Sequence, residues 1–172
     1  HMVYNALAGA LVGRELGLNG EEIKAGIEAL VPVTGRNNMI ETENFLIIDD
    51  CYNANPISTK ASLDVLATAD TRKVAILGDM FELGENEKDL HYGVGQHAAE
   101  KGIDLCICIG ELSKHTAKGA STGNKTVFHF DTKADFLAEM DTLLQKGDTI
   151  LVKASHGMEF PEIVEKLQTL VI

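Results

Sequence analysis

The stretch that decides the fold is Ile47-Ile48-Asp49-Asp50-Cys51-Tyr52-Asn53-Ala54-Asn55-Pro56. An apolar run ends here in two acids, crosses a short polar turn and enters a helix, for which Asn55 is a good N-cap and Pro56 a good first residue. A carboxylate at the carboxyl end of a strand can accept hydrogen bonds from a ribose, and the free amides of a helix start attract anions. An ordinary strand-turn-helix junction, in which Asp and Asn only shape the turn, fits the same letters equally well.

The alternation of apolar runs and helix-forming stretches continues through the rest of the chain. Short apolar runs predict five strands, at 45–48, 74–77, 105–109, 126–130 and 149–152. Helix-forming residues predict five helices, at 57–69, 88–101, 111–119, 132–145 and 159–170. This alternation predicts an α/β fold with a mainly parallel sheet covered by helices on both faces. Residues 38–44 fit an additional antiparallel edge strand that reaches the first strand through a hairpin.

A helical hairpin is predicted ahead of this pattern. Apolar residues recur at helical spacing over 3–17 and 21–30. Asn19, followed three residues later by Glu22, indicates a capping box at the start of the second helix. The hairpin therefore precedes the α/β pattern as a separate helical element.

The hairpin and the α/β pattern are separated by helix-breaking residues. Pro32, Gly35 and the polar residues that follow interrupt the helical periodicity, as is typical of a linker between domains. We therefore expect a boundary near Val33, with one domain at 1–33 and a second at 34–172. A hinge is expected at the same place.

The composition limits the class of protein. The 172 residues are 45% apolar and carry a formal net charge of −11, which suits a folded core but not the basic surface that nucleic acids or anionic membranes require. No apolar run approaches the roughly 18 residues of a membrane span, and no signal-peptide pattern begins the chain, so we expect a cytoplasmic location. The three cysteines lack metal-ligand spacing and are expected to be reduced thiols.

A second loop with unusual side chains follows the predicted strand at 74–77. It reads Leu77-Gly78-Asp79-Met80-Phe81-Glu82-Leu83-Gly84, and its glycines permit a tight turn close to a ligand. Asp79 and Glu82 are suited to receive a substrate ammonium group. Acids that merely solvate a surface loop are the commoner reason for such a pattern.

A third loop follows the predicted strand at 149–152. It reads Lys153-Ala154-Ser155-His156-Gly157-Met158, and Lys153 is suited to meet a carboxylate or a phosphate. Ser155 and His156 are adjacent in sequence, but nucleophile and base are paired by geometry rather than by adjacency, so a hydrolase is disfavoured.

Two common kinds of site are not expected. His91 and His97 lie six residues apart, on different faces of a helix, and His115 and His129 have no acidic or thiol companion at ligand spacing, so no metal site is predicted. Each of these four is expected to be a solvated or capping histidine. The sequence also has no Gly-rich loop ending in Gly-Lys-Ser or Gly-Lys-Thr, and therefore no P-loop for ATP phosphates.

Taken together, in their order and spacing, these segments resemble the Mur ligase family, and most closely its branch that adds D-Ala-D-Ala. The resemblance covers nearly the whole chain. The segments that carry it are Val3-Tyr4-Asn5-Ala6-Leu7-Ala8, Thr34-Gly35-Arg36, Asp49-Asp50-Cys51-Tyr52-Asn53-Ala54-Asn55-Pro56, Leu77-Gly78-Asp79-Met80-Phe81-Glu82-Leu83-Gly84, His91 and Lys153-Ala154-Ser155-His156-Gly157-Met158.

The resemblance implies an arrangement of domains. Members of the family have an N-terminal domain for the UDP-sugar, a central ATPase domain with the P-loop, and a Rossmann-like C-terminal domain that closes over the nucleotide. By this resemblance, 34–172 is the C-terminal domain and 1–33 is the last pair of helices of the central ATPase domain.

The resemblance also implies site residues. Asn5, Arg36 and Asp50 match residues that approach the adenine, the nucleotide at the domain junction and the ribose hydroxyls. A second group matches the region where the incoming dipeptide and the peptide carboxylate meet, namely Asn53, Asn55, Asp79, Glu82 and Lys153. No catalytic residue or metal ligand is expected in this part of the enzyme.

Two positions depart from the family pattern. The last segment usually reads Lys-Gly-Ser-Arg-Gly-Met, whereas Ala154 and His156 stand here at the Gly and Arg positions. A permanent positive charge at position 156 is therefore not expected.

The reaction implied is the ATP-dependent ligation of D-Ala-D-Ala to UDP-MurNAc-tripeptide, in peptidoglycan precursor synthesis. ATP and Mg²⁺ are the implied cofactors, held mainly by the central domain, and the two substrates and the rest of the same ligase chain are the implied partners. Two alternatives remain open from the residues alone: a nucleotide-binding regulatory module without ligase activity, and a sister ligase such as folylpolyglutamate synthase.

Because it lacks a P-loop and a metal site, the 172-residue chain by itself is predicted neither to hydrolyse ATP nor to form the peptide bond. The measurement is phosphate release by the purified chain with ATP, Mg²⁺ and both substrates. Turnover above a heat-denatured control would contradict this prediction.

Overall fold

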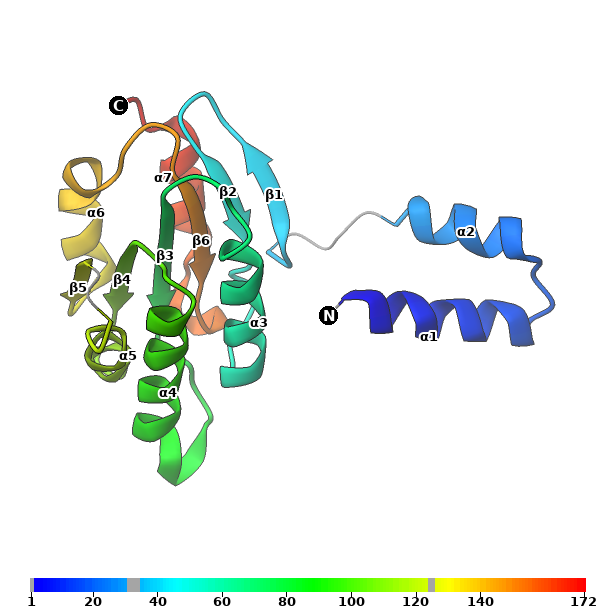
Figure 1. Cartoon of the computed structure of the whole chain (residues 1–172), viewed down its shortest axis with the longest axis horizontal. Coiled ribbons are helices and arrows are strands. Elements are labelled where there is room, and N and C mark those ends of the chain that lie inside the picture. Colours follow the sequence, from blue (N-terminus) through cyan, green and yellow to red (C-terminus); the bar gives the residue numbers. More distant parts are fainter. Residues whose placement is uncertain (1, 31–34, 124–125) are drawn as a thin grey trace. The chain divides into compact units, whose positions relative to one another are not determined.

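The computed structural model describes residues 2–30, 35–123 and 126–172 (Figure 1). Contacts divide the chain into two compact units, His1–Val33 and Thr34–Ile172. The boundary predicted at Val33 and the hinge beside it fall on residues outside the described ranges, so both stay predictions.

The first unit is a pair of helices, α1 (Met2–Glu15) and α2 (Gly20–Glu28). The side-chain oxygen of Asn19 accepts hydrogen bonds from the backbone amides of Glu21 and Glu22, at 3.0 and 3.1 Å. The Glu22 carboxylate in turn accepts a hydrogen bond from the Asn19 amide at 2.8 Å. The predicted capping box is therefore confirmed.

Much of the apolar surface of this helix pair is exposed. Leu7, Leu11 and Leu30 are 59%, 55% and 67% exposed. A groove of about 490 Å³ runs between the helices and is lined mainly by apolar side chains and glycines, among them Gly13 and Ile23. A pair of short helices buries too little apolar surface to be stable alone, so this unit needs a further packing partner.

The second unit is built on a six-stranded sheet in the order β1-β2-β6-β3-β4-β5. The strands are β1 (Asn38–Glu41), β2 (Leu46–Asp49), β3 (Lys73–Gly78), β4 (Leu105–Ile109), β5 (Thr126–Phe130) and β6 (Thr149–Lys153). All neighbouring pairs are parallel except β1 and β2, which form the predicted antiparallel hairpin. The mainly parallel sheet is confirmed.

Helices cover both faces of the sheet, as predicted (Figure 1). Side chains of α3 (Pro56–Leu66), α4 (Glu87–Glu100) and α5 (Ser113–Ala120) pack into one apolar core. Side chains of α6 (Lys133–Leu143) and α7 (Pro161–Thr169) pack into the other. Two short 3-10 turns, η1 (Gly84–Asn86) and η2 (His156–Met158), complete the unit. The largest differences from prediction are at α3, which ends at Leu66 instead of 69, and at β1, which ends at Glu41 instead of 44.

The strands divide their side chains between the two cores. In β3, Val74 and Ile76 belong to the core beneath α6 and α7, whereas Ala75 and Leu77 belong to the core beneath α3, α4 and α5. Such period-two alternation with both sets buried is typical of a parallel sheet covered on both faces. Because every central strand is buried, its polar side chains must gather at the two ends of the sheet.

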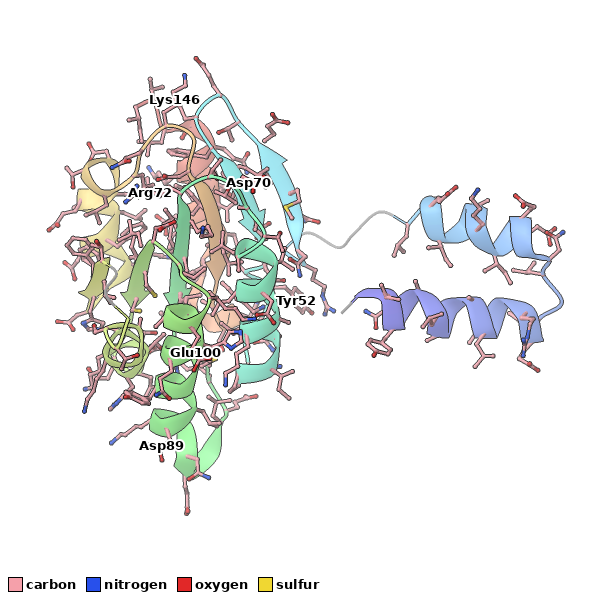
Figure 2. The ribbon with its side chains drawn as sticks, in the orientation of Figure 1. Tyr52, Asp70, Arg72, Asp89, Glu100 and Lys146 are labelled. Atoms are coloured by element: carbon pink, nitrogen blue, oxygen red, sulfur yellow. The ribbon has the colours of Figure 1, made fainter. Side chains whose placement is uncertain are left out.

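At the amino end of the sheet, the half-buried Arg72 pairs with the buried Asp148. Arg72 donates to Asp148 at 3.0 Å and to the Leu143 carbonyl at 3.2 Å. Burial raises the pKa of the Asp148 carboxyl, while the Gln145 amide and Arg72 act in the opposite direction. Figure 2 labels Arg72, and also Tyr52 in the loop at the carboxyl end of β2.

The other predictions from composition concern membranes and thiols. Within the described residues, no helix is long and apolar enough to cross a membrane. Cys51, Cys106 and Cys108 are free and buried, as expected for reduced thiols.

Helices α4 and α5 touch through their backbones. A Cβ placed on Gly95 would lie 2.0 Å from the Thr116 carbonyl oxygen, and one on Gly119 would lie 2.1 Å from the Tyr92 carbonyl oxygen. Backbone atoms at such distances cannot move aside separately, so any side chain at these positions forces the helices apart.

Gly95→Ala is therefore expected to lower the free energy of unfolding by at least about 2 kcal/mol. Gly93→Ala in the same helix is the matched control, because the nearest atom to its Cβ would be Lys60 Nζ at 3.8 Å. The control should leave stability unchanged or raise it by up to about 1 kcal/mol, since alanine is the better helix former. Urea denaturation followed by circular dichroism measures both, and equal effects would argue against the close packing.

Candidate functional site

Three loops meet at the carboxyl ends of the adjacent strands β2, β6 and β3 and line a half-open cavity of about 520 Å³. Ligands of open α/β sheets bind at this end of the strands. Its lining comes from the loop after β2 (Tyr52, Asn53, Ala54, Asn55), the loop after β3 (Phe81, Glu82, Leu83) and the loop after β6 (Ser155, His156, Gly157). The three loops that the sequence singles out therefore share one cavity.

A buried ion pair joins two of these loops. Lys153 Nζ, whose side chain is 2% exposed, lies 2.5 Å from Asp50 Oδ2. The ammonium group also donates to the Asn53 carbonyl at 3.0 Å. Asp50 Oδ2 accepts a second hydrogen bond, from Ser62 Oγ at 2.6 Å. A buried pair of charges is tolerated only when further hydrogen bonds satisfy both partners, and these contacts do so.

The same carboxylate fixes the turn that carries Arg36. Asp50 Oδ1 accepts a hydrogen bond from the Asn37 amide at 3.1 Å. The Gly35 carbonyl accepts one from the Tyr52 amide at 2.9 Å. Gly35 has a φ of +76°, and a Cβ there would lie 3.1 Å from the Tyr52 nitrogen, so glycine alone fits without strain. The Arg36 guanidinium lies over the Tyr52 ring, with Cζ 4.3 Å from the ring centroid.

Ser155 ties the loop after β6 to the loop after β3. Its amide donates to the Asp79 carbonyl at 3.0 Å, and its hydroxyl accepts from the Phe81 amide at 2.9 Å. Ser155 is 4% exposed, which suits a structural link and not a nucleophile. Glu82 follows Phe81 in the loop after β3 and has a φ of +61°, an uncommon conformation for a residue with a side chain. Strained backbone of this kind gathers at functional sites.

The two acids of the loop after β3 have different surroundings. Glu82 is exposed and lines the cavity. Asp79 is 6% exposed, does not line the cavity, and accepts a hydrogen bond from the Ser113 amide at the start of α5, at 2.7 Å. A carboxylate at a helix start is stabilised by the free amides and the helix dipole. Of the pair, Glu82 is thus the acid that a ligand in the cavity can reach.

His91 is fully buried and supports the same loop. Its Nε2 accepts from the Met80 amide at 2.9 Å, while Nδ1 lies 2.7 Å from the Glu87 carbonyl and donates to it in that tautomer. A solvated or capping histidine, the role expected from the sequence, is therefore wrong for His91. The ring connects α4 to the loop that carries Glu82.

Asn53 and Asn55 present amide groups at the cavity. The Asn55 side-chain oxygen caps α3 by accepting from the Ser58 amide at 2.9 Å, and Pro56 is the first helical residue, as predicted. The Asn53 side-chain oxygen accepts from the Ala54 amide at 2.9 Å. Within the described residues, neither side-chain nitrogen has a hydrogen-bond partner, so both remain available as donors.

Cys51, in the same loop, is not a reactive thiol. It is 3% exposed, and its Sγ donates to Asp49 Oδ1 at 2.8 Å. Burial and the Asp49 carboxylate both raise the pKa of the Cys51 thiol far above its ordinary value. The thiolate is the nucleophilic form, so Cys51 stays inert at neutral pH.

The α/β unit brings together those residues proposed from the sequence that belong to it. Arg36, Asp50 and Lys153 lie in one connected network with the cavity loops, whereas Asn5 belongs to the helix pair. Sequence reasoning missed the supporting roles of Asn37, Ser62, Ser155 and His91. The signals available were the positions of Ser155 and His91 among the family segments and of Asn37 beside Arg36, whereas nothing in the sequence pointed to Ser62.

The described ranges contain no group of three or more His, Cys, Asp or Glu side chains that could hold a metal ion.

Residues 35–156 match the family model described as Mur ligase, glutamate ligase domain. The chain belongs to the Mur ligase family. It is 36% identical over 98% of its length to the UDP-N-acetylmuramoyl-tripeptide–D-alanyl-D-alanine ligase of Escherichia coli strain K12, of which it covers 37%. Among solved Mur ligases, MurF from Acinetobacter baumannii aligns with a TM-score of 0.88 at 30% identity, over 96% of this chain and 37% of that one.

A further Mur ligase structure contains a nucleotide. MurF ligase from Thermotoga maritima, in complex with ADP, aligns with a TM-score of 0.75 at 26% identity, over 92% of this chain and 35% of that chain. The chain therefore spans little more than a third of the length of the Mur ligases it matches.

Lys153→Met is predicted to destabilise the α/β unit by about 3–5 kcal/mol, because it leaves the Asp50 carboxylate buried without its counter-charge. The double variant Lys153→Met/Asp50→Asn has neither buried charge and should recover part of the lost free energy of unfolding. The measurement is chemical denaturation of both variants and of the unmodified chain.

Lys146→Met is the control for this prediction. Lys146 Nζ lies 3.9 Å from Glu43 Oε1, and the two side chains are 60% and 88% exposed. Such surface ion pairs contribute little, so stability should hardly change. Equal losses in the two lysine variants would mean that the buried pair has no special role.

Proposed function

We propose that this chain is the C-terminal domain of an ATP-dependent ligase that adds D-Ala-D-Ala to UDP-MurNAc-tripeptide in peptidoglycan precursor synthesis. One observation carries the proposal. The three loops that line the 520 Å³ cavity, after β2, β3 and β6, contain sequence segments that resemble those of the D-Ala-D-Ala-adding ligases. The 36% identity to the D-alanyl-D-alanine-adding ligase of Escherichia coli supports the proposal.

The cavity suits a small zwitterion such as D-Ala-D-Ala. Glu82 supplies a carboxylate for the ammonium group, and the free side-chain amides of Asn53 and Asn55 supply donors for the carboxylate. In this proposal the domain orients the acceptor amine towards the activated peptide carboxylate and excludes water, which accelerates the reaction through positioning.

Lys153 and Asp79 act in this proposal through the loops and not by direct contact with substrate. The Lys153 ammonium group is buried against Asp50, and the Asp79 carboxylate is buried at the start of α5. Each therefore fixes the backbone that carries the cavity residues. This role differs from the substrate contact that the resemblance implies for both.

The nucleotide-facing residues in this proposal are Arg36 and Asp50. The Arg36 guanidinium is exposed and able to meet phosphate charge. A carboxylate offers about four acceptor positions, of which Asp50 uses three for Asn37, Ser62 and Lys153, so one remains for a ribose hydroxyl. Bound ATP with Mg²⁺ supplies the phosphoryl group that activates the peptide carboxylate. The ADP complex of the Thermotoga maritima relative supports nucleotide binding.

The helix pair 1–33 is proposed to be the end of the central ATPase domain. Its exposed apolar side chains and the groove of about 490 Å³ support this, because they need cover from further protein. The rest of the same ligase chain would provide that cover and would bring Asn5 to the adenine and the metal ligands to the phosphates. The proposal includes a cytoplasmic location, where ATP is available.

A chimeric ligase tests this proposal. The segment of the Escherichia coli ligase that aligns with this chain is replaced by residues 1–172, and phosphate release is measured with ATP, Mg²⁺, UDP-MurNAc-tripeptide and D-Ala-D-Ala. We expect turnover that disappears when D-Ala-D-Ala is omitted. A folded chimera without turnover, or one that accepts glutamate in place of D-Ala-D-Ala, would contradict the proposal, the latter in favour of a sister ligase.

The role of Glu82 is tested in the same chimera. Glu82→Gln removes the charge but keeps the shape, and kcat/KM for D-Ala-D-Ala should fall roughly ten- to hundredfold through a higher KM. Glu85→Gln is the matched control, since Glu85 is an exposed acid three residues further along, in η1, that does not line the cavity. A similar response of both variants would remove Glu82 from the acceptor site.

A further inference from the structure

The side chain of Arg36 is held by a single aromatic ring. The backbone on either side of it is fixed twice, through the Gly35 carbonyl and the Asn37 amide. Within the described ranges, the guanidinium itself makes no hydrogen bond or ion pair, and its described contact is with the face of Tyr52. An arginine side chain loses much rotamer freedom when it is fixed, so this one contact decides where the charge points.

The same ring belongs to the cavity. Tyr52 lines the cavity beside Asn53, and its ring lies 5.9 Å from the His156 ring, centroid to centroid, with the planes tilted by 49°. Tyr52 is 46% exposed, so its ring is not fixed by a core of its own. The position of Tyr52 is fixed instead by its backbone amide, which donates a hydrogen bond to the Gly35 carbonyl. One side chain thus contacts both the Arg36 turn and the wall of the acceptor cavity.

We propose that Tyr52 is a positioning residue that holds Arg36 in its nucleotide-binding orientation and couples that orientation to the acceptor cavity. The inference rests on the proposed function, because it needs Arg36 to face a nucleotide and the cavity to hold the acceptor. An acceptor that presses on the Tyr52 ring changes the surface against which the guanidinium stacks. In the opposite direction, a nucleotide that binds Arg36 fixes the guanidinium, and the guanidinium then fixes the Tyr52 ring on which it stacks.

The contact itself is tested on the 172-residue chain. A guanidinium stacked on an aromatic face has its side-chain proton resonances displaced upfield by the ring current. Tyr52→Leu should return the Arg36 Hδ and Hε resonances to ordinary values, Tyr52→Phe should keep the displacement, and Phe128→Leu, at an exposed aromatic on β5, should leave it unaltered. Undisplaced Arg36 resonances in the unmodified chain would overturn the proposal.

The functional consequence is tested in the chimeric ligase. Tyr52→Leu should raise the KM for ATP by about two- to fivefold, the size expected for an exposed cation-π contact, with a smaller change in kcat. Tyr52→Phe should return the KM for ATP towards that of the unmodified chimera. The double variant Arg36→Ala/Tyr52→Leu should have the same KM for ATP as Arg36→Ala alone, because Tyr52 acts through Arg36.

The outcomes separate the two proposals. An inactive parent chimera contradicts the ligase function and leaves the resonance experiment to decide whether Tyr52 holds Arg36. An active chimera in which Tyr52→Leu leaves the KM for ATP unchanged, or in which the Arg36 and Tyr52 effects simply add, overturns the positioning role while the ligase function stands. Arg36 is the suitable partner for this cycle, because changing Asp50 would disturb the buried ion pair as well.

Discussion

The contact on which the rest of this site depends is the buried pair of Lys153 and Asp50, 2.5 Å apart and 103 residues apart in sequence. It joins the carboxyl ends of β6 and β2, which are adjacent in the sheet. Removing two charges from water costs several kcal/mol per ion, and the cost is offset only when every remaining donor and acceptor finds a partner. The partners here are loop groups, such as the Asn37 amide and the Asn53 carbonyl, so satisfying the pair also fixes the loops.

Much of the fold follows from local patterns in the sequence. The strand at 126–130 has the predicted bounds, and the caps at Asn19 and Asn55 form as expected, because apolar periodicity and capping are decided within a few residues. The site residues in the three loops were found because each loop follows a strand. The resemblance then supplied candidate roles, and in the α/β unit the structure places Asn53, Asn55 and Glu82 at one cavity and the other candidates in the loops and the network beside it.

The remainder could not be predicted, because it depends on which distant segments pack together. Nothing near Lys153 in the sequence indicates that its partner is Asp50 and not a ligand. The same holds for His91, which looks like a surface histidine until α4 packs beneath the loop at Met80. The difference between Asp79 and Glu82 also arises only from tertiary structure, since the start of α5 captures the first acid and leaves the second free.

The order of the strands has a consequence for how the site is made. β6 lies between β2 and β3, although it follows both by 70 residues or more in the sequence. During synthesis the ribosome releases β2, α3 and β3 long before β6, and the edges of β2 and β3 that pair with β6 stay unpaired until β6 emerges. The nascent protein therefore has unpaired backbone edges on β2 and β3, and its Asp50 carboxylate lacks the counter-charge of Lys153. Its dependence on chaperones should be greatest in the interval before residue 153 emerges.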